Sequence, residues 1–171
     1  MSAPTSGEAA ACERILEGHS DALRSVTVSS ADGGCRWALT GSVDRTAKLW
    51  DLQSGECMCT LKGHADTVFS VTTSNADGGC RWALTGSVDR TAKLWDLQSG
   101  ECVRTFHGHT SWVWSVRISS ADGGCRWALT GSDDGTAKLW DLQSGECVRT
   151  LEGHTDHVYS VAISSADGGC R

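Results

Sequence analysis

The sequence predicts an all-β fold made of repeated units, each with about four short strands. The dipeptides Gly-His and Trp-Asp recur at a constant spacing of 45 residues, which is typical of a repeat architecture. Short segments in which apolar and polar residues partly alternate lie between glycine-rich turns, as half-buried strands do. No unit contains ten residues of helical period.

The repeat organises almost the whole chain of 171 residues. Within it, residues 31–57 recur unchanged at 76–102, and they recur at 121–147 with Asp133 in place of Val43 and Gly135 in place of Arg45. Full units begin at Cys12, Cys57 and Cys102, and a partial unit runs from Cys147 to Arg171. The histidines of the Gly-His pairs are His19, His64, His109 and His154. The tryptophans of the Trp-Asp pairs are Trp50, Trp95 and Trp140.

Four strands are expected in order within the first unit. Residues 23–28 alternate in part and end at a Ser-Ser-Ala-Asp-Gly-Gly turn cluster. Residues 37–40 form the second strand, which the turn at 41–44 closes. Residues 46–50 form the third, because apolar Ala and Leu enclose a polar Lys. A Gln-Ser-Gly-Glu turn follows, and residues 57–61 form the fourth strand.

This combination of motifs resembles the WD-repeat β-propeller family over residues 12–171. The resemblance implies four-stranded blades around a central channel, with the strand before each Gly-His belonging to the preceding blade. It therefore implies a propeller of three complete blades plus an incomplete fourth. The fourteen expected strands are one outer strand at 13–17, three blades at about 22–62, 67–107 and 112–152, and one inner strand at about 157–163.

The turn at residues 31–37 departs from the family, because it is longer than usual and ends in a tryptophan. We expect Trp37 and its counterparts Trp82 and Trp127 to pack over one face or between blades. An aromatic binding platform is the alternative.

Each full unit also carries a histidine, a serine and an aspartate, and the resemblance implies that they form a structural clamp with the Trp-Asp tryptophan. A buried indole N–H needs an acceptor, and buried polar side chains must bond to one another. A hydrolase triad uses the same residue types, but an active site does not require a copy in every unit, so we expect no catalytic residue and no enzyme. The clamp residues are His19, Ser42, Asp44, Trp50, His64, Ser87, Asp89, Trp95, His109, Ser132, Asp134 and Trp140, while His154 lacks counterparts of its partners.

No motif indicates a metal or a cofactor. The cysteines recur twice in each unit, but the only close pair, Cys57 and Cys59, has one residue between them, whereas a zinc site normally uses a longer spacing. A phosphate-binding loop is also missing from the sequence. We therefore expect buried or rim thiols without function, no metal and no cofactor, and a metal or redox role of the cysteines is the alternative.

The units differ from one another mainly around Gly-His, and the resemblance implies that these positions lie on the top face, where partner peptides dock. Several of them are aromatic residues or arginine, the types enriched in binding hot spots. Drift at unconstrained positions is the alternative. The expected partner-binding residues are Ala22, Arg24, Val43, Thr67, Phe69, Val88, Trp112, Trp114, Asp133, His157 and Tyr159.

The charge balance and the termini bound the cellular setting. The net charge of −6 argues against a nucleic-acid binder, which needs a basic face. The sequence contains no apolar run long enough to cross a membrane. Residues 1–11 read as a flexible tail without the features of a signal peptide. We expect a cytoplasmic protein, with the nucleus as the alternative, whose nine cysteines stay reduced.

Three blades are too few to close a propeller ring, since members of this class have about 4–8 blades. The sequence therefore predicts an open ring that copies of the chain complete, or a fragment of a larger propeller protein. The leading functional hypothesis is a non-catalytic scaffold that binds a protein or peptide on the top face. A self-assembling structural module, a homo-oligomer, is the alternative.

Overall fold

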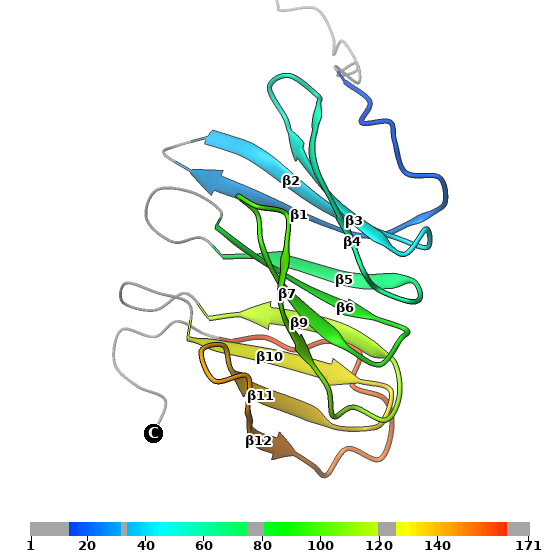
Figure 1. Ribbon diagram of the computed structural model, residues 1–171. Coiled ribbons are helices and arrows are strands. Elements are labelled where there is room, and N and C mark those ends of the chain that lie inside the picture. The colour runs from blue at the N-terminus through cyan, green and yellow to red at the C-terminus, as the bar shows by residue number, and fades with distance from the viewer. Residues whose placement is uncertain (1–13, 32–33, 75–80, 120–125, 164–171) are drawn as a thin grey trace, which may run out of the picture.

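The computed structural model describes residues 14–31, 34–74, 81–119 and 126–163, and within these ranges it contains twelve strands and no helix (Figure 1). The strands form three four-stranded sheets. The strands are β1 (Leu23–Ala31), β2 (Gly34–Ser42), β3 (Thr46–Asp51), β4 (Cys57–Lys62), β5 (Val68–Thr73), β6 (Trp82–Ser87), β7 (Ala92–Asp96), β8 (Cys102–Phe106), β9 (Val113–Ile118), β10 (Trp127–Ser132), β11 (Ala137–Asp141) and β12 (Cys147–Leu151).

Each sheet, which we call a blade, is an antiparallel meander in chain order: β1–β4, β5–β8 and β9–β12. Short connections between successive strands favour this order, because antiparallel neighbours need no crossover. Figure 1 shows the three blades following one another, and the first strand of each blade contacts the first strand of the next. This is the arrangement of successive propeller blades, and the ring is not closed by the described residues.

The hydrophobic cores lie between blades. Leu39, Leu49 and Leu61 of the first blade pack with residues of the second that include Val71 and Trp95. An equivalent cluster joins the second blade to the third. Each blade therefore buries its apolar face against a neighbour, as expected for repeat architectures in which no unit has a core of its own.

A glycine in the second strand of each blade allows this close approach. A Cβ atom on Gly86 would lie 2.8 Å from methyl carbons of Val113 and Val116 in the next blade. Gly41 and Gly131 occupy the same position in the other blades. The Gly-Ser turn that the sequence repeats in every unit therefore also sets the spacing between blades.

The chain forms twelve described strands rather than the fourteen expected, because the segments at 13–17 and 157–163 do not become strands over their described residues. Among the described residues neither segment joins a strand ladder, which a strand requires, although the N–H of Val158 donates to the carbonyl of Ser132 at 2.9 Å. Residues 157–163 nevertheless occupy the place of a next inner strand, since Val158 and Val161 are buried against Gly131. The expected tail at residues 1–11 lies outside the described residues.

Trp37 and Trp82 are half-buried and pack against the clusters between blades, which confirms the expected packing between blades. The guanidinium of Arg36 lies 4.7 Å from the ring centre of Trp37, and Arg126 covers Trp127 in the same way. Such cation–π contacts, together with this burial, leave little open ring surface for a separate aromatic platform.

Candidate functional site

The histidine of each full unit bridges its aspartate and one threonine hydroxyl, and the tryptophan donates to the same hydroxyl. In the first blade, His19 Nδ1 lies 2.7 Å from Asp44 Oδ2 and His19 Nε2 lies 2.7 Å from Thr40 Oγ1. The indole N–H of Trp50 donates to the same Thr40 oxygen at 2.8 Å. The same contacts join His64, Thr85, Asp89 and Trp95 in the second blade and His109, Thr130, Asp134 and Trp140 in the third.

The prediction that serine is the bridging hydroxyl is wrong for Ser42, Ser87 and Ser132. Ser42 Oγ instead donates to the carbonyl of Ala22 at 3.0 Å and accepts the N–H of Asp44 at 3.1 Å. Two residues along a strand correspond to about 6.6 Å, so the serine at the end of β2 is beyond the reach of the indole. Ser87 and Ser132 accept the N–H of Asp89 and Asp134 in the same way, and they donate to the carbonyls of Asp66 and Ser111.

Each threonine, histidine and aspartate forms a chain like that of a hydrolase triad, but the hydroxyl is unsuited to attack. Thr40, Thr85 and Thr130 are buried, and their oxygens already accept an indole N–H. A nucleophile must be accessible to its substrate and activated by its base. The arrangement therefore fits a structural clamp rather than a catalytic site.

Burial opposes ionisation of the clamp aspartates, but hydrogen bonds outweigh it. Hydroxyl and histidine donors and two backbone N–H groups lower the pKa of Asp134 to about 2, and similar contacts hold the pKa of Asp44 and Asp89 well below the ordinary range. Burial lowers the pKa of His109 against the opposing effect of Asp134. An ionised aspartate beside a neutral histidine, which donates at Nδ1 and accepts at Nε2, satisfies every group of the third clamp.

A β-bulge sets the direction of one variable residue of each blade. In the first strand of the blades, the bulge leaves one residue outside the pairing with the second strand, between Leu23 and Ser25 in the first blade. Bulges re-aim side chains and often lie beside functional sites. The residues at the bulges are Arg24, Phe69 and Trp114.

These residues and their neighbours form a continuous stack across the three blades. The ring centres of Phe69 and Trp114 are 4.4 Å apart, and that of Tyr159 lies 5.6 Å from Trp114. Arg24 lies 5.6 Å from the ring centre of Phe69, and Trp112 contacts both Phe69 and Trp114. We call Arg24, Phe69, Trp112, Trp114 and Tyr159 the rim stack.

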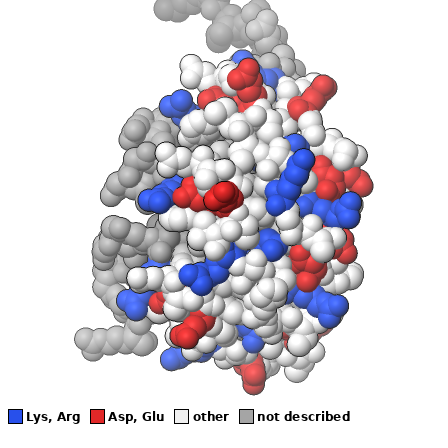
Figure 2. Space-filling model, viewed as in Figure 1, with Lys and Arg blue, Asp and Glu red and all other residues white. Residues whose placement is uncertain are grey.

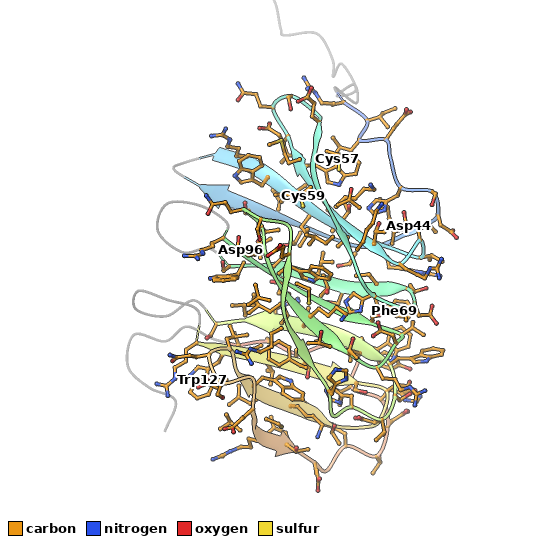
Figure 3. The ribbon with its side chains drawn as sticks, viewed as in Figure 1. Asp44, Cys57, Cys59, Phe69, Asp96 and Trp127 are labelled. Carbon is orange, nitrogen blue, oxygen red and sulfur yellow. The ribbon has the colours of Figure 1, made fainter. Side chains whose placement is uncertain are left out.

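The rim stack lies at the clamp end of the blades and is open to solvent. Figure 3 places Phe69 and Asp44 at the same end, with Trp127 at the opposite end. Trp112 is 43% exposed and Tyr159 is 62% exposed. A molecule that approaches this end therefore meets aromatic surface.

Asp133, which replaces the valine of the other two blades, ties the rim stack to the segment that follows the third blade. Its carboxylate accepts the indole N–H of Trp114 at 3.2 Å and the hydroxyl of Ser111 at 2.8 Å. Nδ1 of His157 lies 2.8 Å from the same carboxylate, and the His157 ring contacts Tyr159. These donors lower the pKa of Asp133.

Four of the predicted partner-binding residues stand apart from this group. Val43 and Val88 are half-buried, and their N–H groups donate to the carbonyls of Ala22 and Thr67. Thr67 is buried, while Ala22 is exposed. Among the described contacts these four support the backbone of the rim, and their side chains make no ring or charge contact with it.

A cavity of about 410 Å³ lies beside the rim stack, between the first strands of the blades. Phe69, Trp114 and Tyr159 form part of its wall, and the rest is mostly hydroxyl side chains with Arg117. Sequence reasoning did not select Arg117 as a site residue. One signal in the sequence could have identified it. Arg117 lies at a repeat position where the units differ, and the other units have Thr27, Thr72 and Ala162 there.

Other chemistry finds no support in the described part of the chain. No group of three His, Cys, Asp or Glu residues there is placed to hold a metal ion. Cys57, Cys59, Cys102 and Cys147 are free thiols, and burial raises the pKa of Cys59. No described helix is long and apolar enough to cross a membrane.

The family model described as "WD domain, G-beta repeat" matches four segments of the chain. The matched segments are residues 10–51, 55–96, 100–141 and 145–171.

Proposed function

Because this chain belongs to the WD-repeat family, we propose that it is a non-catalytic scaffold whose rim stack binds a protein or peptide. WD repeats generally mediate interactions between proteins. The observation that carries the proposal is the solvent-open rim stack itself, three of whose five residues lie at β-bulges of successive blades, far apart in the sequence.

The residue types of the rim stack support binding. Tryptophan, tyrosine and arginine dominate interface hot spots, because each buries a large area and also offers a polar group. Exposed aromatic side chains otherwise leave apolar surface in water, which monomeric proteins keep small.

The contacts between variable positions argue against drift. Trp114, Asp133 and His157 are each the only one of their type at the corresponding position of the units, and they bond to one another. Independent drift at unconstrained positions would not produce three residues whose side chains fit together.

The distribution of charge supports a protein partner over a nucleic acid. Figure 2 shows Lys and Arg interspersed with Asp and Glu over the face it presents, and the net charge is −6. A phosphate backbone would gain little counterion release from such a surface. Free exposed thiols such as Cys102 suit a reducing compartment, so we place the protein in the cytoplasm or the nucleus.

A variant of two exposed rim residues tests the proposal. We expect the double substitution Trp112→Thr with Tyr159→Ala to lower affinity for the partner by at least roughly tenfold, because hot-spot truncations cost that much or more. The proteins retained from an extract of the source organism by the wild type, the rim variant and Met58→Ala, a control on exposed β4, would be compared by mass spectrometry.

A protein held by the wild type and the Met58 variant but lost by the rim variant is the expected partner. The same retained proteins on all three baits would contradict rim binding. Unchanged thermal unfolding of the rim variant excludes a folding defect.

The exposed ends of the row of blades support a second candidate, self-assembly. Val26 on the first blade is 64% exposed, whereas its counterpart Val71 in the second blade is 3% exposed. Further repeats of a longer propeller would cover the same surfaces. The exposed ends are therefore consistent both with self-assembly and with a fragment of a longer propeller. The oligomeric state tests self-assembly, as argued in the Discussion.

A further inference from the structure

We propose that the cavity beside the rim stack binds a carboxylate of the partner peptide, with Arg117 as its charged ligand. The inference rests on the proposed rim function and adds the chemistry of the bound peptide. It follows from the hydrogen-bonding capacity, the charge and the position of the cavity wall.

The cavity wall has spare hydrogen-bond donors. The hydroxyl oxygens of Ser25, Ser70 and Ser115 accept the backbone N–H groups of Val71, Val116 and Val161, each at 3.2 Å. A serine hydroxyl has one O–H to donate, and none of these three donates to another group in the described part of the chain. Three serines lining one cavity can therefore turn their O–H groups toward a ligand.

Arg117 is the one charged residue among the described residues that line the cavity. Within the described part of the chain, its guanidinium donates one hydrogen bond, from a terminal nitrogen to the carbonyl of Val116 at 2.8 Å. The remaining N–H groups point to no carboxylate of the described chain. A wall with surplus donors, one cation and no acidic residue favours an anionic ligand, because charge-assisted hydrogen bonds to carboxylates are among the strongest in proteins.

The bulge brings the cation and the aromatic surface within the span of one peptide. Ser115 and Arg117 are two residues apart and lie on one face of β9, while Trp114 occupies the bulge before them. Three residues of strand span about 10 Å. A bound peptide can therefore place an apolar side chain on the rim stack and a carboxylate, about three residues away, beside Arg117.

The units themselves provide matched variants. Threonine stands at the position of Arg117 in the first two units, at Thr27 and Thr72, so Arg117→Thr is compatible with the fold. Arg149 is an exposed residue of β12 outside the cavity. Arg149→Thr therefore removes the same charge from the molecule without touching the proposed site.

Nuclear magnetic resonance with defined peptides tests the site. The first probe is acetyl-Leu-Gly-Gly-Glu-Gly amide, the second has Gln in place of Glu, and the third is the Gln peptide with a free terminal carboxylate. We expect the first probe to shift the Nε–H signal of Arg117 and the amide signals of Val71, Val116 and Val161. The Gln amide should bind roughly tenfold more weakly, since it lacks the charged partner.

The third probe tests whether the carboxylate can come from a peptide C-terminus as well as from an acidic side chain. Shifts at Arg117 equal to those of the first probe would show that the site accepts both. Arg117→Thr should reduce binding of the Glu peptide to the level of the Gln amide, and Arg149→Thr should leave it unchanged. Equal binding of the Glu and Gln amides, equal binding by Arg117→Thr, or no shift at Arg117 at millimolar peptide would overturn the inference.

The Trp112 and Tyr159 rim variant distinguishes this inference from the rim function. If it binds the Glu peptide as the wild type does while Arg117→Thr does not, the carboxylate site stands and the rim function fails. If the rim variant loses the peptide while Glu and Gln probes bind equally, the rim function stands and the carboxylate site fails.

Discussion

At the scale of single residues, one threonine hydroxyl in each blade determines whether three other polar groups can be buried. Thr85 accepts the indole N–H of Trp95 and contacts Nε2 of His64. The histidine in turn positions Asp89, whose second oxygen binds Thr91. Removal of this hydroxyl therefore affects the whole clamp of the blade.

We predict that Thr85→Val lowers the free energy of unfolding by about 2–4 kcal/mol, because the isosteric side chain leaves two buried groups unpaired at about 1–3 kcal/mol each. Urea denaturation measures the change. Thr110→Val, on an exposed residue, is the control and should stay within about 0.5 kcal/mol of the wild type. Equal unfolding midpoints for the two variants would contradict the clamp.

The resemblance to the WD-repeat family was sufficient to predict which histidines, aspartates and tryptophans are brought together, but it did not identify the correct hydroxyl. Thr40 and Ser42 are two residues apart, so strand alternation places both on the same face. Only the pairing of Ala38 with Trp50 shows that Thr40 lies nearer to the indole. The register of β2 against β3 is thus the missing information.

At the scale of elements, the strand order follows from the repeated turns, whereas the bulges, the cavity and the bounds of β1 and β2 do not, since these two strands extend into the predicted turns. The extra residue of each bulge has no sequence signature here, because Leu or Val precedes it and Ser follows it, as in an ordinary strand. The cavity forms because β1, β5 and β9 converge, and it brings together Ser25, Ser70 and Ser115 from three units. No pattern within one unit contains this convergence.

The segment at residues 157–163 is held by side chains and by one backbone hydrogen bond, from the N–H of Val158 to the carbonyl of Ser132 at 2.9 Å, rather than by a strand ladder. His157 contacts the carboxylates of Asp133 and Asp156, Val158 and Val161 are buried, and the N–H of Val161 donates to Ser115 Oγ. A hydrogen bond to the Asp133 backbone, together with the two carboxylates, raises the pKa of His157 above 6.5.

We predict that this segment docks less firmly as the pH rises. A histidine whose folded-state pKa is raised contributes stability that is fully present below pH 6.5 and is lost as the pH passes the folded-state value. The amide of Val161 should therefore exchange its hydrogen faster once the pH exceeds the folded-state pKa of His157, after correction for the intrinsic exchange rate.

Asp133→Val, which introduces the residue found at Val43 and Val88, should remove this pH dependence. Asp21→Val, at an exposed position on the first blade, should preserve it. If the exchange rate of the Val161 amide depends on pH in the same way in the wild type and in Asp133→Val, the contact between His157 and Asp133 is not the cause of the pH dependence.

At the scale of the whole molecule, the row of blades has two different ends that correspond to the two sides of each internal interface. Val26 on the first blade is exposed where Val71 and Val116 are buried, and Leu151 on the third blade is 44% exposed where Leu61 is 1% exposed. Surfaces of this kind associate head to tail and generate rings or filaments.

We predict that the 171-residue chain forms oligomers whose mass rises with concentration, measured by size-exclusion chromatography with light scattering. Val26→Glu should give a monomer, because it places a charge in the interface between blades. Val148→Glu, on an exposed valine of β12 away from the interface clusters, should associate like the wild type. A wild type that stays monomeric at every concentration would contradict self-assembly.

The β-bulges have a consequence for how such a molecule can change its specificity over evolutionary time. Positions 24, 69 and 114 lie outside the strand ladder, so selection can exchange the side chains there without disturbing the clamps or the cores between blades. Arginine, phenylalanine and tryptophan already occupy these equivalent sites. Duplication of a unit followed by a single codon change at its bulge would therefore give the protein a new ligand preference on an unaltered framework.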